Sequence, residues 1–295
     1  MDTLMQLCGL CLILLIIPVV HTVPWGYPQT KPGTDYWPKI YPMYCAGLSQ
    51  SPIDIRTTAT IKTEPVSFDL LGFGAEAPRG ASIVVQNSGL SAQVKLKGDY
   101  FVSGGGLPGA QYKAASIHFH WGSTNDRGSE HTVDGRQAPA EMHIVTHDVR
   151  FATVSEAAYK VDGLAVLGFF IEIQAQANPK FQALVDALGK LKFNGDTFTL
   201  PAPFALSDLL PNTNIMMPYF RYRGSLTTPT CNEVVVWTVF KMPIRLSQAQ
   251  LNVFRSLLET SPGAPVEIPL VDNWRPTQPL NGRLIYHSAG VLRSN

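Results

Sequence analysis

Residues 116–123, Ser-Ile-His-Phe-His-Trp-Gly-Ser, have the composition of a β-strand. Side chains along a strand alternate between its faces, so His118 and His120 share one face and Phe119 points to the other. A third histidine, His143, lies in a second strand-like run over residues 140–145. Three neutral imidazoles and a water form the open tetrahedral site of a catalytic zinc. The pattern predicts a zinc site, and the alternative is a chance pairing of histidines on a half-buried strand.

The composition is that of an ordinary globular protein and limits the choice of partners. The 295 residues are 45% hydrophobic and 15% charged, enough to bury one large core or two modest ones. Lys+Arg 23 against Asp+Glu 22 gives a net charge of +1 with no basic stripe, which argues against nucleic acid and gives no support for anionic lipid binding. No repeat or linker interrupts the chain, so one domain over residues 24–293 is the simplest account.

The first residues have the features of a targeting segment. Residues 4–20 are almost uninterruptedly apolar and predict a secretory signal peptide over residues 1–23. An uncleaved anchor is the alternative, because Asp2 is the only charge before the apolar run; that run is short for a bilayer span, which needs about 20 apolar residues. Residues 284–295 have no hydrophobic tail, so we expect a secreted, extracellular protein with no membrane span after cleavage.

Two cysteines remain outside this leader. Cys8 and Cys11 fall within it, which leaves Cys45 and Cys231. In an oxidising compartment two remaining cysteines usually pair. The alternative is a pair of buried free thiols, and the residues alone leave it open.

Alternating runs broken by Gly and Pro predict many short strands from residue 66 onward. Residues 164–173 and 232–240 are longer apolar runs and predict two central strands. Two helices are predicted, one that follows Pro179 and one that starts at Ser247 with a capping-box pattern and runs to Leu258. Residues 23–44 are rich in Pro, Tyr and Trp without periodicity and predict an ordered arm over the domain.

Several motifs together resemble the α-class carbonic anhydrases. They are the His-x-His stretch, Gly-Ser-Glu-His-Thr-Val-Asp from Gly128, Ala-Glu-x-His from Ala140, Gln-Ser-Pro-Ile-Asp-Ile from Gln50, Asp-Gly-Leu-Ala-Val-Leu-Gly from Asp162, Gly-Ser-Leu-Thr-Thr-Pro from Gly224 and Asp-Asn-Trp-Arg-Pro from Asp272. The resemblance implies a mainly β (α+β) fold, a single domain with a large twisted, mostly antiparallel sheet of about ten strands and peripheral helices. Cys45 and Cys231 are similar to the disulfide pair of the secreted members.

The resemblance also implies a catalytic or binding role for each matched residue of the reaction centre. Zn²⁺ would be held by His118, His120 and His143 and would lower the pKa of its bound water to about 7, so that hydroxide attacks CO2. Thr227 would accept a hydrogen bond from that hydroxide and donate its own to Glu130. Thr228 would contact the bicarbonate product.

Other residues would support this centre. Glu141 lies two residues before His143 on the same strand face, where its carboxylate can hold the imidazole. By resemblance, the backbone carbonyl of Asn273 would orient His120. The apolar wall for CO2 would consist of five side chains, for which plain core packing is the alternative role: Val145, Val166, Leu226, Val235 and Trp237.

Two positions depart from the family pattern. Leu90 stands where the family usually has a histidine that carries protons, and leucine cannot do so. We therefore expect turnover to be limited by proton transfer. Ser116 stands where many relatives have a glutamine that contacts the first ligand, so we expect His118 to be held less firmly.

The expected function is reversible hydration of CO2 to bicarbonate and a proton, by a secreted zinc enzyme that sulfonamide-type inhibitors would block. The alternative is a catalytically weak binding or biomineral matrix protein of the same family. Such relatives usually lack one of the zinc histidines, and the chain has no acidic or Gly-rich mineral-binding block. A zinc peptidase is disfavoured because there is no His-Glu-x-x-His helix.

Overall fold

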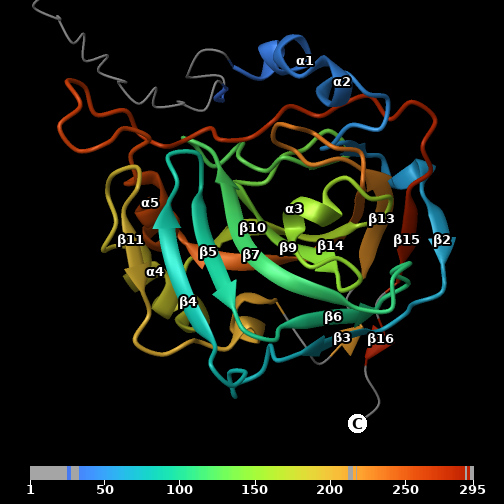
Figure 1. Ribbon diagram of the computed structural model, residues 1–295, viewed down its shortest axis with the longest axis horizontal. Helices are drawn as coiled ribbons and strands as arrows, with labels where there is room; N and C mark the ends of the chain where they lie inside the picture. The colour runs from blue at the N-terminus through green and yellow to red at the C-terminus, as the bar shows by residue number, and fades with distance from the viewer. Residues whose placement is uncertain (1–24, 28–32, 212–214, 217, 290, 293–295) are drawn as a thin grey trace, which may run out of the picture.

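The computed structural model describes residues 25–27, 33–211, 215–216, 218–289 and 291–292. In this part of the chain a twelve-stranded sheet forms the centre, and ten of its strands follow the order β11-β4-β5-β7-β9-β10-β14-β13-β15-β2 (Figure 1). The strands of this sheet are β2 (Ile61–Thr63), β3 (Phe68–Leu71), β4 (Ser82–Asn87), β5 (Ala92–Lys97), β6 (Phe101–Gly104), β7 (Tyr112–Trp121), β9 (Ala140–Asp148), β10 (Leu164–Gln174), β11 (Thr197–Thr199), β13 (Tyr219–Gly224), β14 (Val235–Ser247) and β15 (Tyr286–Ser288). Two small pairs lie outside it, β1 (Asp54–Ile55) with β8 (Thr132–Val133) and β12 (Ile215–Met216) with β16 (Val291–Leu292).

The large sheet is mostly antiparallel. Strand β10 pairs with β14 in parallel, and so does β15 with β2, whereas the other pairs of this sheet are antiparallel. The predicted fold class, mainly β with one large twisted sheet, is confirmed. The two predicted central strands are β10 and β14, which lie next to each other.

Helices are few and short. They are η1 (Thr34–Tyr36), α1 (Trp37–Ile40), α2 (Pro42–Cys45), η2 (Thr57–Ala59), α3 (Val154–Ala157), η3 (Pro179–Phe181), α4 (Gln182–Leu188), η4 (Leu206–Leu209) and α5 (Gln248–Arg255). The two predicted helices are η3 with α4 and α5, and α5 begins after Ser247 with the expected capping box. The arm is ordered in its described residues, as expected, but residues 34–45 form short helical turns that the sequence did not predict; these turns lie at the top of Figure 1.

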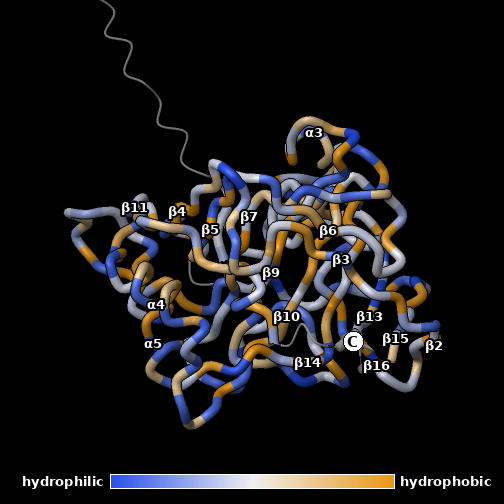
Figure 2. The backbone as a smooth tube through the Cα atoms, turned by 90° about the horizontal axis from the view of Figure 1, so that it is seen from below, coloured by the Kyte–Doolittle hydropathy of each residue, from blue (hydrophilic) through white to orange (hydrophobic). Residues whose placement is uncertain are grey.

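The sheet is buried on both faces because residues along its strands alternate between two cores. On β7, Ile117, Phe119 and Trp121 join the larger cluster, together with residues of α4 and α5. On β10, Val166 joins the second cluster with Trp237, while its neighbour Leu167 joins the first. In Figure 2 orange and pale or blue segments alternate along the strands. The histidines of β7 therefore point to the side of the second core.

The predicted leader, residues 1–23, lies outside the described residues. Among the helices that the structure does describe, none has the length and apolar character needed to cross a bilayer.

Candidate metal centre and active site

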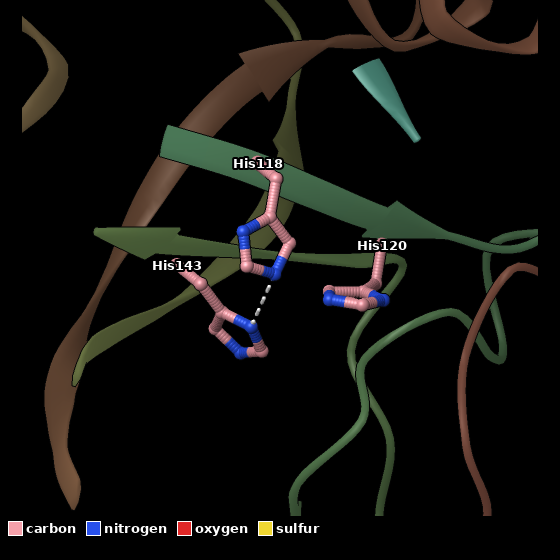
Figure 3. A group of neighbouring side chains, drawn as sticks. All are labelled: His118, His120 and His143. Atoms are coloured by element: carbon pink, nitrogen blue, oxygen red, sulfur yellow. Dashed lines mark hydrogen bonds between the residues drawn. The ribbon is translucent and has the colours of Figure 1, made fainter. Parts of the chain in front are cut away.

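Three histidines converge from two neighbouring strands. His118 and His120 project from the same face of β7, and His143 projects from β9, where it is the direct cross-strand partner of His118 (Figure 3). The Nδ1 of His143 lies 3.2 Å from Nε2 of His118, and the ligand atoms of the three residues lie within 4.8 Å of one another. A tetrahedral zinc with Zn–N bonds of ordinary length has ligand nitrogens about 3.3 Å apart. The spacing therefore suits a single zinc ion.

The outer nitrogens of two of these rings are held by hydrogen bonds. The Nδ1–H of His120 donates to the backbone carbonyl of Asn273 at 2.7 Å, and the Nε2–H of His143 donates to Oε1 of Glu141 at 2.7 Å. Each bond selects the tautomer whose lone pair faces the centre of the cluster. The rings are thus oriented as metal ligands before a metal binds.

Burial keeps the three imidazoles neutral. It lowers the pKa of His118 well below its usual range, with a further contribution from the neighbouring His120. It also lowers the pKa of His120 to about 3 and that of His143 below its usual value, although Glu141 opposes the shift at His143. Neutral imidazoles are the form that binds metal, so no proton has to leave at pH 7.

An unsatisfied buried nitrogen tests whether a metal fits here. Among the described residues, Nε2 of His120 and Oε2 of Glu130 are buried without a hydrogen-bond partner, and they lie 3.4 Å apart. A second group, His131, Glu141 and His143, also has metal-binding atoms close together. Its members are already bonded to one another, so it needs no ion. The three-histidine group, in contrast, has a buried nitrogen without a partner, which a bound cation would satisfy.

Glu130 and Thr227 meet beside this cluster. Burial raises the pKa of Glu130 well above its usual range, while the side chain of Thr227 and the backbone N–H of Arg275 oppose that shift. The Arg275 N–H donates to Oε1 of Glu130 at 2.8 Å, which leaves Oε2 facing the histidines. A bound cation would add a further force that favours the charged carboxylate.

The expected apolar wall belongs to one cluster. Val166, Val235 and Trp237 are buried in the second core, with Val145 and Leu226 packed against them. The Trp237 ring lies 4.8 Å from the His143 ring, and its Nε1–H donates to the backbone carbonyl of Ser225. Thr228 follows Thr227 in the same turn, where its carbonyl accepts from the N–H of Cys231.

The two departures from the family pattern have clear surroundings. Leu90 follows a turn at Gly89 (φ +74°) and packs against the buried cluster of Tyr27, Trp37, Cys45 and Cys231. In the described part of the chain no hydrogen bond joins Ser116 to His118.

The Cys45–Cys231 disulfide is formed, and both residues are buried. It joins α2 to the turn that follows Thr228, close to the expected reaction centre. The free-thiol alternative is therefore wrong.

Sequence reasoning missed how far the supporting network extends. His131 bonds Glu141 through Nδ1 and the hydroxyl of Tyr222 through Nε2, each at 2.7 Å. Arg275 donates from its guanidinium to Gln50 and to the carbonyl of Ser51. Arg275 stands in one of the quoted motifs, but the role of Tyr222 had no local signal.

Comparison with known proteins agrees with this geometry. Residues 32–289 match the family described as eukaryotic-type carbonic anhydrase. The chain is 37% identical to carbonic anhydrase 3 of Homo sapiens and 42% identical to carbonic anhydrase 7 of Mus musculus, in each case over 88% of this chain and 96% of the relative. It is 34% identical to carbonic anhydrase 15 of Mus musculus over 95% of this chain and 87% of that relative. The chain therefore belongs to the eukaryotic-type carbonic anhydrases, which are zinc enzymes, and its three converging histidines can hold that metal.

Proposed function

We propose that this protein catalyses the reversible hydration of CO2 to bicarbonate and a proton, with zinc held by His118, His120 and His143. The observation that carries the proposal is the convergence of three neutral imidazoles, with two rings locked by Asn273 and Glu141. When bound, zinc supplies the Lewis acidity that lets a water molecule ionise near neutral pH. The matrix-protein alternative is not favoured, because the metal-binding group is complete.

Thr227 and Glu130 are proposed to orient the attacking oxygen. The charged carboxylate of Glu130 can only accept, so it draws the Thr227 hydroxyl proton toward itself. The Thr227 oxygen is then left to accept a hydrogen bond, which aims a lone pair of the attacking oxygen at CO2. Thr228 would contact bicarbonate in the same turn. An apolar wall would hold CO2, because its side chains offer no hydrogen bonds to water that could compete for the same space. This wall consists of Val145, Val166, Leu226, Val235 and Trp237.

Proton release is proposed to be the slow step. A proton must leave the centre in every cycle, and an imidazole with a pKa near 6.5 transfers it best at neutral pH. Leu90 packs among aromatic side chains and offers no such group. Small buffer molecules that enter from solvent would then carry the proton.

We also propose that the protein is made with a cleaved signal peptide over residues 1–23 and acts outside the cell as one domain over residues 24–293. The apolar run of residues 4–20 supports this, and so does the disulfide, which persists in oxidising compartments. Aromatic sulfonamides are expected to inhibit by binding at the metal.

The test is stopped-flow CO2 hydration with zinc-loaded protein, protein stripped by a chelator, and stripped protein reloaded with zinc. Loss of a metal that supplies several kcal/mol should lower the rate by at least about 10³-fold, and reloading should restore it. His118→Ala should behave like stripped protein, whereas His287→Ala, away from the cluster, should keep full activity. Equal rates with and without zinc would refute the proposal.

A further inference from the structure

A cavity of about 380 Å³ lies on the face of the sheet that points away from the metal centre. Arg221 and Arg223 alternate along β13 with Tyr222, whose hydroxyl lies on the metal side, bonded to His131. The two arginines therefore share the opposite face. In register with them stand Tyr286 on β15 and Val236 on β14, which form the apolar floor.

Three arginines line this cavity. Arg283 joins Arg221 and Arg223 in the lining, and its Nη1 donates to the backbone carbonyl of Arg223 at 3.1 Å. No acidic residue lines the cavity. Outside the lining, Asp162 pairs with Arg223 at 2.8 Å. The Arg223 side chain is 66% exposed and that of Asp162 is 19% exposed, so solvent screens the arginine end of the pair and another anion can compete for it.

The other two arginines are held by neutral acceptors. Arg221 donates to the carbonyls of Gly105 and Gly106 and to the Thr238 hydroxyl, which uses three of its five N–H groups and leaves two. Arg283 donates to backbone carbonyls only. In the described part of the chain no carboxylate lies within ion-pair distance of either. Glu233 acts on Arg283 at longer range but is itself bonded to Ser49 N and to Gln50.

This arrangement holds positive charge in place without neutralising it. The backbone carbonyls orient the guanidiniums, and burial lowers the pKa of both Arg221 and Arg283 below the usual range of an arginine. An oxyanion would accept from the two remaining N–H groups of Arg221 and from the one N–H that Arg283 keeps after its four bonds to carbonyls. Leu284, Tyr286 and Val236 leave room beside it for an apolar body.

We propose that the cavity bounded by Arg221, Arg223 and Arg283 binds a small organic anion, a phosphate or carboxylate carried on an apolar body. Its volume lies within the range of small-molecule sites. The site is separate from the metal centre, because Arg221, Arg223 and the paired residues Tyr286 and Val236 lie on the other face of the sheet. Tyr222 and Arg283 also line the cavity, and the Arg283 guanidinium lies over the Tyr222 ring at 5.6 Å from its centre. Phosphate and carboxylate present the same acceptor chemistry, and the experiment distinguishes them.

The test is calorimetric titration of zinc-loaded protein with phenyl phosphate, benzoate, inorganic phosphate and phenol, at fixed ionic strength. We expect saturable one-to-one binding of phenyl phosphate or benzoate, with the tighter of the two identifying the head group, and weaker binding of inorganic phosphate and phenol. Arg223→Gln should weaken binding about tenfold, because one charge-assisted contact is lost. Arg245→Gln is the matched control, because the Arg245 side chain is about as exposed as that of Arg223 and pairs with Glu172 away from the cavity. This control variant should change the affinity for phenyl phosphate less than twofold.

Two further arms locate the ligand. Saturating aromatic sulfonamide should leave the affinity for phenyl phosphate unchanged, and loss of binding in its presence would assign the ligand to the metal and overturn the proposal. Tyr286→Ala should weaken phenyl phosphate but not inorganic phosphate. Absence of saturable binding by either organic anion, or equal effects of Arg223→Gln and Arg245→Gln, would also overturn it.

Discussion

Glu141 is the residue on which the metal-binding geometry most depends. Its Oε1 accepts from His143 and His131 at 2.7 Å each, and its Oε2 accepts from the backbone N–H groups of Glu130 and His131. Burial alone would raise the pKa of Glu141, but the two imidazoles and these bonds hold the pKa well below its usual range. The charged carboxylate thus sets the tautomer of His143 and anchors the segment that carries Glu130.

Replacing Glu141 by glutamine should weaken zinc binding by about 10- to 100-fold. The amide has one acceptor oxygen in place of two, so at least one donor loses its partner, and His143 loses the charge that favours its metal-binding tautomer. Competition with a chromogenic chelator measures the zinc affinity. Glu172→Gln, at an exposed carboxylate that pairs with Arg245, is the control and should bind zinc like wild type. Identical affinities in both variants would contradict this role.

Leu90→His should raise CO2 hydration at low buffer concentration, because it places a titrating imidazole where Leu90 offers none. The gain should shrink as imidazole buffer is added, since free imidazole then relieves the same step in wild type. Stopped-flow rates against buffer concentration give the comparison. Leu90→Asn disturbs the packing against the cluster of Tyr27 and Trp37 without adding a proton carrier, so it should show no gain. A wild-type hydration rate that does not change with buffer concentration would show that proton transfer is not rate-limiting.

At the scale of elements, the N-terminal cap of α5 also connects this helix to a second helical segment. The Ser247 hydroxyl accepts from Gln250 N at 3.2 Å, and Gln250 Oε1 accepts from Ser247 N at 3.1 Å. Gln250 also bonds both backbone groups of Asn178, which caps η3. The cap therefore ties the end of β14 to the start of the other helical segment.

Ser247→Ala should lower the free energy of unfolding by about 1 kcal/mol, the usual cost of losing an N-cap. Urea denaturation followed by tryptophan fluorescence measures it. Ser256→Ala, near the C-terminal end of the same helix, removes an exposed hydroxyl bonded to Val253 O and should have a smaller effect. If both variants unfold at the same urea concentration as wild type, the cap makes no net contribution.

At the scale of the whole molecule, the disulfide connects parts of the chain that are 186 residues apart. Cys45 and Cys231 pack with Tyr27 and Trp37, so the bridge holds the N-terminal turns over the domain. The metal ligands, by contrast, lie on strands β7 and β9 inside the sheet. Stability and metal binding should therefore respond differently to its loss.

The double variant Cys45→Ala, Cys231→Ala should lose about 2–5 kcal/mol of unfolding free energy, because a long loop is no longer closed in the unfolded chain. Zinc affinity should change little. Guanidinium denaturation with and without reductant measures the effect: reductant should destabilise wild type toward the variant and leave the variant unchanged. A variant as stable as oxidised wild type would disprove the contribution.

Features that repeat within a few residues could be predicted from the sequence. Strand alternation places His118 and His120 on one face and Phe119 on the other, and the cap pattern at Ser247 marks the start of α5. The family motifs also pointed to the large sheet and to Cys45 with Cys231. The short turns of residues 34–45 were missed, because isolated helical turns of four residues leave no periodic signal.

The side chains that can bind the metal are predictable from the sequence, because the two-residue period of a strand fixes which neighbours share a face. The fold supplies the groups that hold those side chains: Asn273 reaches His120 across 153 positions, and Tyr222 closes the network through His131. It also decided that Leu90 packs among aromatic rings and that three arginines share one cavity. These contacts depend on strand register and order, which are set by the burial of both faces of the sheet at once and not by any local stretch of residues.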